Sequence, residues 1–460
     1  MNEKATANPL GTERVGRLMV RYATPSIISL VVNSLYNMVD QVFIGQDVGY
    51  LGNAATNVVM PMTLIMMALS LMLGDGGAAY MSLNLGKGKP ETAAKGIGVM
   101  ASASVVLGVV VAILFELFLE PLCGLFGATQ DNLPYALEYG RIIVLGFPFF
   151  AISSGFAGVI RADGRPNASM IGLLIGCATN LILDPVFIFV CGWGVAGAAW
   201  ATILGQILNA IYFVICFFRF RTIKLERRHF RPDWTVLKKI CLLGVSSFIT
   251  QVTIVFVMAV MNNLLVKYGA LSKYGPDIPL AALGITVKVS QLITSIVLGF
   301  ATGIQPIFGF NYGSKQYERV KKTYKIALLV NTLIMVAGLA VFQIFPESII
   351  SLFGQESELY MEFAVKCFRI YLLMCILIPA VCVTGIFFQA LGKPVRAAVL
   401  SLTRQIIFLI PAMFLFSALG GVEGMLWAGP FSDGLSGVCS LVVVLASWKG
   451  LFGEKEKQNG

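Results

Sequence analysis

The chain has 460 residues, of which 57% are hydrophobic and only 13% charged, and its mean hydropathy is +0.81. This composition excludes an ordinary soluble protein and indicates a membrane protein. The net charge of +10 does not indicate nucleic-acid binding, because the basic residues lie in short runs between apolar segments, where the positive-inside rule explains them.

Apolar runs of about 20 or more residues predict roughly twelve membrane-spanning helices, because a helix of that length crosses the hydrocarbon core. Several runs are longer and should tilt, bend or protrude. We therefore expect an all-α membrane protein. In chain order, the expected spans are 17–44, 51–83, 93–119, 133–160, 168–191, 194–219, 237–268, 278–311, 320–345, 360–391, 396–418 and 422–450.

The loops between these spans alternate in charge. Lysine and arginine follow the second, fourth and sixth spans, whereas the loops QDVGYLGN, EPLCGLFGATQDNLP and PESIISLFGQESELY carry neither. The positive-inside rule then places both chain ends on the cytoplasmic side of the plasma membrane.

An internal repeat relates the two halves of the chain. DGRPNAS matches LGKPVRA and GVAGAAWA matches GVEGMLWA, at nearly equal separations (392 − 164 = 228 for Gly164 and Gly392; 427 − 200 = 227 for Trp200 and Trp427). Six helices per half give both copies the same orientation, so we expect two pseudo-symmetric six-helix bundles around a central cavity. The expected parts are a cytoplasmic N-terminal segment 1–16, an N-lobe 17–219, a basic linker 220–236, a C-lobe 237–450 and a cytoplasmic tail 451–460.

The stretch NLILDP interrupts the fifth apolar run with an amide, an acid and a proline. Asn180 and Asp184 are four residues apart, so both project from one face of a helix. Pro185 cannot donate a hydrogen bond to the carbonyl of Leu181, which leaves that oxygen for an ion, a water or a neighbouring helix. The matching stretch of the second half, IFLIPA, keeps a proline at Pro411 but has no acid. We infer that the proline shapes both halves and that the acid serves only one.

Asp40, deep in the first span, and Thr202, in the sixth, extend this polar set. Two carboxylates, an amide oxygen and a hydroxyl suit a hard cation such as Na+, or a proton shared by the two acids. An ionisable side chain in the centre of a membrane helix costs from about 3 to more than 10 kcal/mol, which favours a functional role for Asp40 and Asp184. Asn180 and Thr202 alone would more often be hydrogen-bonding contacts between helices.

Other polar residues and prolines also lie within the expected spans. Pro25 is either a simple bend or a hinge of the first span, and Pro185 is a second candidate hinge. Asp75 is expected near the cytoplasmic end of the second span, in a solvated or helix-end position. Lys288 and Asp433 could pair between the eighth and twelfth spans. Together with these two, the side chains that could line a polar cavity in the second half are Gln251, Asn262, Asn263, Gln291 and Gln389.

The spans offer little for catalysis. The single histidine, His229, lies in the basic stretch RFRTIKLERRHFR, and the nine cysteines show no paired ligand spacing. No phosphate-cradling loop followed by a lysine occurs inside the spans. We therefore expect a protein that is not an enzyme and that uses no cofactor other than a coupling ion.

The chain resembles the multidrug and toxic compound extrusion (MATE) family over nearly its whole length. The resemblance rests on the TPS of the first span, NMVDQVFIG, the turns NLGKGK and NYGSK, DGRPNAS, NLILDP and GVAGAAWATILGQ. It implies an antiporter that exchanges a cation for organic, often cationic, compounds. It also implies that Asp40, Asn180, Asp184 and Thr202 are similar to the cation site of the first lobe, and that Pro25 matches a proline at which the first helix bends in some members.

Members of the NorM branch carry acids in the seventh and tenth helices, and we expect none inside those spans here. The chain looks more like the DinF or MepA type, with coupling by H+ or Na+ confined to the first half. By resemblance we expect a monomer in the lipid bilayer. The alternative is a lipid-linked saccharide flippase of the same superfamily, but such proteins usually have extra helices and a cationic cavity, whereas only Lys288 lies deep in a span here.

Overall fold

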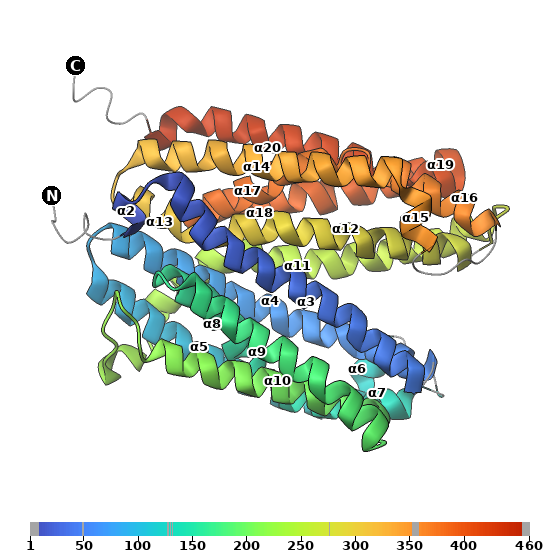
Figure 1. Cartoon of the computed structure of the whole chain (residues 1–460), viewed down its shortest axis with the longest axis horizontal. Coiled ribbons are helices and arrows are strands. Elements are labelled where there is room, and N and C mark those ends of the chain that lie inside the picture. The colour runs from blue at the N-terminus through green and yellow to red at the C-terminus, as the bar shows by residue number, and fades with distance from the viewer. Residues whose placement is uncertain are drawn as a thin grey trace.

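The computed structural model describes residues 9–47, 50–126, 128, 130, 132–275, 277–351 and 358–452. Within these ranges it describes the backbone but not the side chains at 37, 38, 40–42, 45–47, 50–54, 277, 449, 450 and 452. The described residues form helices and connecting turns without a strand. Figure 1 shows the long helices side by side in two bundles along the longest axis of the molecule.

The N-lobe is built from the first half of the chain. Its helices are α2 (Pro9–Thr12), α3 (Val15–Asp47), α4 (Tyr50–Gly86), α5 (Pro90–Leu117), α6 (Leu119–Leu125), α7 (Leu133–Leu145), α8 (Phe147–Ala162), α9 (Pro166–Pro185), the π-helix η1 (Val186–Val190) and α10 (Gly194–Phe217). A connection that contains the short 3-10 helix η2 (Arg227–Phe230) leads to the second lobe.

The C-lobe repeats this order. Its helices are α11 (Trp234–Gly269), α12 (Asp277–Gly303), α13 (Gln305–Gly313), α14 (Tyr317–Ile344), α15 (Pro346–Ser351), α16 (Glu358–Lys366), η3 (Cys367–Tyr371), η4 (Cys375–Leu377), α17 (Ile378–Ala390), α18 (Pro394–Leu402), η5 (Thr403–Leu409), α19 (Ile410–Met425) and α20 (Ala428–Phe452).

The prediction of about twelve spans is confirmed. Among the described residues, 11 helical segments are long and apolar enough to cross a membrane, and α7 with α8, bent by 54°, brings the number to 12. The bend lies at Gly146, just before Pro148, whose missing N–H and fixed φ favour a break in the helix. The first long helix begins at Val15, two residues before the predicted start of the N-lobe.

The two lobes share their backbone geometry, so the predicted repeat is present in three dimensions. α5 and α14 begin at equivalent positions (317 − 90 = 227) and both have 28 residues. Left-handed backbone also recurs at matching positions: Gly164 and Gly392 have φ of 85° and 75°, and Gly88 is matched by Lys315 at 63°. Lys315 is the only non-glycine residue with positive φ in the described part of the chain, which indicates that the repeated turn outweighs the steric cost of its side chain.

Both described chain ends, the start of α2 and the end of α20, lie at the same end of the molecule, which we call the terminal end (Figure 1). The other end, where α6, α7, α15 and α16 lie, is called the opposite end. The lobes are in close contact in the terminal half, where α4 packs against α11 and α13, and α3 against α12. Glycines make this approach possible: a Cβ on Gly76 would lie 2.2 Å from the carbonyl oxygen of Ile240, and one on Gly244 only 1.8 Å from that of Met72.

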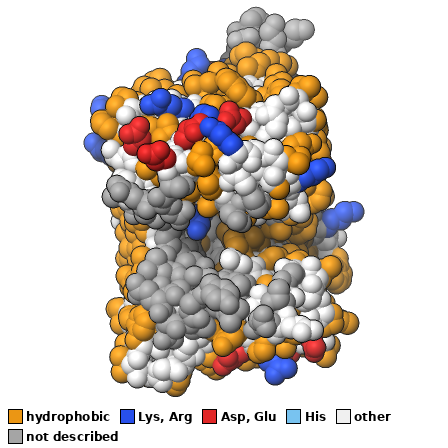
Figure 2. Space-filling model, turned by 90° about the vertical axis from the view of Figure 1, so that its right-hand side faces the viewer, with side chains coloured by type: hydrophobic (Ala, Val, Ile, Leu, Met, Phe, Trp, Pro, Cys, Tyr) orange, Lys and Arg blue, Asp and Glu red, His pale blue; other side chains and the backbone are white. Residues whose placement is uncertain are grey.

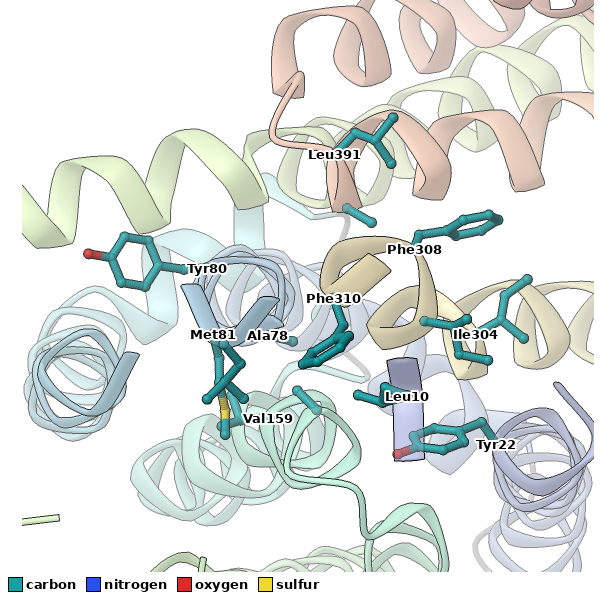
Figure 3. Packing of buried hydrophobic residues seen from close by; sticks show 14 of the residues in the cluster. Leu10, Tyr22, Ala78, Tyr80, Met81, Val159, Ile304, Phe308, Phe310 and Leu391 are labelled. Carbon is teal, nitrogen blue, oxygen red and sulfur yellow. The ribbon is translucent and has the colours of Figure 1, made fainter. Parts of the chain in front are cut away.

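The buried apolar clusters follow the same division. The largest cluster joins both lobes at the terminal end, where Leu10 and Tyr22 pack with Ile304 and Phe310 (Figure 3). Towards the opposite end each lobe has a separate cluster of its own. Figure 2, which looks onto the opposite end, shows the surface hollowed between the two lobes. The lobes are therefore joined at the terminal end and separated at the other.

Candidate functional site

The polar set of the N-lobe lies where α9 and α10 pack together. Gly176 of α9 faces Gly205 of α10, and a Cβ on Gly205 would lie 2.7 Å from the carbonyl oxygen of Gly176. Small residues let two membrane helices approach this closely. The contact is one turn from Asn180 and one turn from Thr202, so it brings these two side chains within hydrogen-bonding reach.

Asn180 is the centre of a hydrogen-bonded triad. Its Nδ2 donates to Asp184 Oδ1 at 3.2 Å and to Thr202 Oγ1 at 3.1 Å. Asn180 is only 3% exposed and Asp184 is fully buried. The amide oxygen of Asn180 is also buried and has no hydrogen-bond partner within the described residues. Three of the four residues predicted as a cation site are thus brought together, with one acceptor oxygen available to a ligand.

Asp184 occupies a junction between two kinds of helix. Pro185 ends α9, and the π-helix η1 begins at the next residue, Val186. The missing N–H of the proline removes one rung of the regular ladder, which allows the wider turns of a π-helix. In the C-lobe the order is reversed: Pro411 comes just after a π-helix, η5, and is preceded by the apolar Ile410. Both lobes therefore have a proline beside a π-helix, but only the N-lobe has an acid there.

The side chain of Asp40 lies outside the described part of the structure, but its position in α3 can be placed. α3 packs against α9 and η1. The Asn33 side chain hydrogen-bonds Cys177, and Ile44 packs with Ile188. In both pairs the residue numbers differ by 144 (177 − 33 and 188 − 44). Position 40 and Asp184 have the same difference (184 − 40 = 144), so position 40 of α3 lies at the level of Asp184.

This arrangement has the chemical groups that a small cation requires of its site. A carboxylate without solvent is costly, so Asp184 gains from a proton or from a metal ion. Oxygen atoms of a carboxylate, an amide and a hydroxyl are ligands suited to Na+, and Asn180 supplies an unused oxygen of this kind. Among the described residues, no three His, Cys, Asp or Glu side chains gather in a way that could hold a metal ion.

Comparison with known proteins identifies the family to which the chain belongs. The family model described as MatE matches residues 25–186 and 245–415, which together make up well over half of the chain. The chain belongs to the MatE family. The matched segments lie one in each lobe and include α9, with Asp184, and its counterpart around Pro411.

The relatives of this MatE chain extend the comparison over most of its length. A protein named Multidrug export protein MepA from Staphylococcus haemolyticus is 26% identical over 425 residues, which cover 90% of this chain and 89% of the relative. One of the same name from Staphylococcus aureus is 26% identical over 94% of this chain and 93% of its own length. The resemblance to the MepA type is thus confirmed.

Solved structures show the same fold. A MOP superfamily transporter from Pyrococcus furiosus superposes with a TM-score of 0.90 at 22% identity, covering 98% of this chain and 99% of that one. A structure described as the outward-facing conformation of a multidrug resistance MATE family transporter gives the same values. The predicted all-α fold of two bundles is confirmed.

The expected position of Asp75 is wrong. Asp75 lies inside α4, eleven residues before its end at Gly86, and it contacts the other lobe of the MatE fold. Ser247 Oγ of α11 donates to Asp75 Oδ2 at 2.7 Å, and Gln389 Nε2 of α17 donates to the same Ser247 hydroxyl at 3.2 Å. The helix extends further than the apolar run suggested, so an acid expected at a helix end becomes part of the lobe interface.

Asp433 does not pair with Lys288. Its Oδ1 accepts from Arg404 Nε at 2.8 Å, and Asp433 is only 7% exposed. Arg404 lies in η5, which packs against α20, and Ser432 Oγ donates to the Arg404 carbonyl at 2.6 Å. Lys288 is exposed on α12. The pair joins the two last spans of the C-lobe instead of the eighth and twelfth.

The remaining cavity residues of the C-lobe are not brought into one site by any contact between them. Asn262, Asn263 and Gln291 are exposed, and Asn263 Nδ2 donates to the carbonyl of Ala259 in its own helix. Gln251 is partly buried, whereas Gln389 is 3% exposed and belongs to the contact with Ser247 described above. That these residues line a cavity stays a prediction.

The two candidate hinges differ in their surroundings. Pro25 lies in the interior of α3, which continues through it, and its carbonyl accepts from Ser29 Oγ at 2.8 Å. Pro185 stands at the transition from α9 to η1. Pro185 is therefore at a change of helical geometry, while Pro25 is within a continuous helix.

Two features were missed from the sequence. Glu362 lies within the tenth span, where no acid was expected, but at the opposite end, and its carboxylate accepts from Lys366 Nζ at 2.8 Å and Lys273 Nζ at 2.9 Å. Asn209 is 6% exposed in α10, and its amide oxygen has no partner among the described residues. Asn209 lies two turns after Thr202 on the same face, and that spacing was the available signal.

Proposed function

We propose that this chain is a secondary active multidrug exporter, which exchanges H+ or Na+ for small organic, often cationic, compounds as a monomer in the plasma membrane. The observation that carries the proposal is the buried Asp184, held by Asn180 beside Thr202 in the N-lobe alone. Membership of the MatE family and relatives named as multidrug export proteins support it.

In this proposal the terminal end faces the cytoplasm, because the lysine- and arginine-rich loops are at that end. The described conformation is then closed to the cytoplasm and hollowed towards the outside.

The coupling step is the neutralisation of Asp184. A proton or Na+ arriving from outside would remove the cost of the buried charge and change the hydrogen bonds that Asn180 makes to Asp184 and Thr202. Because Asn180 and Asp184 lie on α9, which packs against both α3 and α10, a change there alters how the first helix sits in the lobe. Substrate release follows if the ion-bound lobe binds substrate less tightly.

Coupling requires a difference in affinity between two states and nothing more. A hundredfold loss of substrate affinity on ion binding corresponds to about 2.7 kcal/mol, within the usual range for coupled sites. Burial of one carboxylate is worth at least this much, since it costs several kcal/mol to keep an ion in a membrane interior. One acid can therefore supply the coupling energy.

The test is transport of a fluorescent organic cation in proteoliposomes with an imposed proton gradient, an imposed sodium gradient, or neither. We expect one gradient to drive transport in the native chain and Asp184→Asn to abolish it. Glu347→Gln, which neutralises an exposed acid of α15, is the control and should transport normally. Transport that ignores both gradients would refute the proposal.

A further inference from the structure

A basic cavity lies at the terminal end, outside the polar site of the N-lobe. Its volume is about 850 Å³, and it lies between the start of α3 and the start of α14. Arg14, Arg17, Arg319 and Lys322 line it, against a single acid, Glu318. Glu318 is itself engaged by Lys321, whose Nζ donates to its Oε1 at 2.8 Å. The cavity therefore has a marked excess of positive charge.

The basic side chains divide into one that builds the cavity and three that remain available. Arg319 Nε donates to Asn311 Oδ1 at 2.9 Å, and its Nη2 donates to the carbonyls of Leu10 at 3.1 Å and Glu13 at 2.7 Å. Arg319 thus fixes α2 against α13 and α14. Arg14, Arg17 and Lys322 are exposed, and none forms an ion pair with another described side chain.

An apolar surface continues from the cavity along both helices. On α14, Lys322 is followed on the same face by Ile326, Leu329 and Leu333, and the last two are 61% and 59% exposed. On α3, Val20, one turn after Arg17, is 66% exposed. At 1.5 Å per residue, Leu333 lies roughly 16 Å below Lys322, which is about the depth of one leaflet.

We propose that this cavity binds the phosphate of an anionic phospholipid, whose acyl chains lie along Leu329 and Leu333. Arginine and lysine at the membrane surface recognise such headgroups, and guanidinium groups bind phosphate oxygens in a bidentate manner. A soluble phosphate would use the same charges but not the apolar surface. The apolar continuation is the reason to assign a lipid.

Such a lipid would touch both lobes at once. Arg14 and Arg17 belong to the N-lobe and Lys322 to the C-lobe, and the cavity lies at the end where the lobes are in contact. A ligand that binds one conformation better than the other stabilises that conformation. The bound lipid therefore favours the conformation closed at the terminal end.

The test uses the full-length protein in a neutral detergent. The melting temperature is followed while phosphatidylglycerol, phosphatidylcholine or inorganic phosphate is added. Phosphatidylglycerol should raise the melting temperature, and the other two should not at equal concentration. In the double variant Arg17→Gln/Lys322→Gln the apparent Kd for phosphatidylglycerol should rise about 30-fold, since each basic residue near an anionic lipid contributes roughly a factor of five.

Two further variants keep the test decisive. Lys325→Gln removes an exposed lysine of α14 outside the cavity and should bind phosphatidylglycerol like the native chain. Arg17→Lys/Lys322→Arg keeps both charges and should bind it as well, even if the neutral double variant folds poorly. Equal stabilisation by phosphatidylcholine, or an equal loss in Lys325→Gln, would overturn the site. Equal stabilisation by inorganic phosphate would overturn the lipid assignment.

Discussion

Replacing Gly244 by alanine should open the lobe contact at the terminal end. The added Cβ would lie 1.8 Å from the carbonyl oxygen of Met72, whereas ordinary van der Waals contact begins at 3.4 Å. α4 and α11 must therefore move apart by about 1.6 Å (3.4 − 1.8), because the atom in the way belongs to the backbone and cannot rotate aside. Overpacking of this kind costs about 1 to 3 kcal/mol.

This energetic cost arises only in the conformation in which α4 and α11 are in contact at the terminal end. It should shift the ratio of closed to open molecules by roughly 5- to 150-fold, since about 1.4 kcal/mol corresponds to a factor of ten. The assay is the distance between spin labels placed at the exposed positions Lys89 and Lys393, which lie in terminal-end turns of the two lobes. Gly244→Ala should increase the population with the longer distance.

The matched control is Gly385→Ala in α17, where an added Cβ meets nothing within 4 Å. It should leave the distance distribution unchanged. If Gly244→Ala gives the native distance distribution and transports at the native rate, the contact between the lobes does not control the conformation, and this prediction is refuted.

Two further predictions concern ion pairs. Arg404→Leu leaves the buried Asp433 without its charge partner and should lower the free energy of unfolding by about 3 to 5 kcal/mol, seen as a lower melting temperature. The double variant Arg404→Leu/Asp433→Leu should recover most of this stability. An equal loss in both variants would contradict the prediction. Asp233 caps α11 and bonds to Lys95, and mainly this bond lowers the pKa of Asp233 below its ordinary value of 3.8. The stability that Asp233 contributes is present above about pH 4 and is lost as the pH falls through the lowered pKa. The Asp233→Asn variant should therefore have a lower melting temperature than the native chain at pH 7, and its melting temperature should fall less on acidification. An equal fall of the melting temperature in both proteins would refute this prediction.

The spans could be predicted because the bilayer imposes a length on each apolar run. The lobes could be predicted because the repeat keeps the same turn positions, as at Gly164 and Gly392. The pair Asn180 and Asp184 could be predicted because it lies within one helical turn. In all three cases the signal is local, or it is repeated along the chain.

Apart from Glu362, which the sequence itself places inside the expected span 360–391, the errors involve contacts between different segments of the chain. Asp75 meets Ser247 only because α4 and α11 approach through glycines, and no local pattern reports that approach. Asp433 pairs with Arg404 because η5, which contains Arg404, packs against α20. The basic cavity combines Arg17 with a helix some 300 residues further on. Such pairs depend on packing, which a single sequence does not encode in its periodicity.

The central claim is that Asp184, with Asn180 and Thr202, takes up an ion that substrate binding expels. The most direct measurement is ion release when an organic cation is added to the purified protein. Protons are followed with an indicator dye in weak buffer, and sodium is followed with a radioactive tracer. The native chain should release one of the two ions and Asp184→Asn should release neither, while still binding the organic cation. Undiminished release from Asp184→Asn would contradict the account.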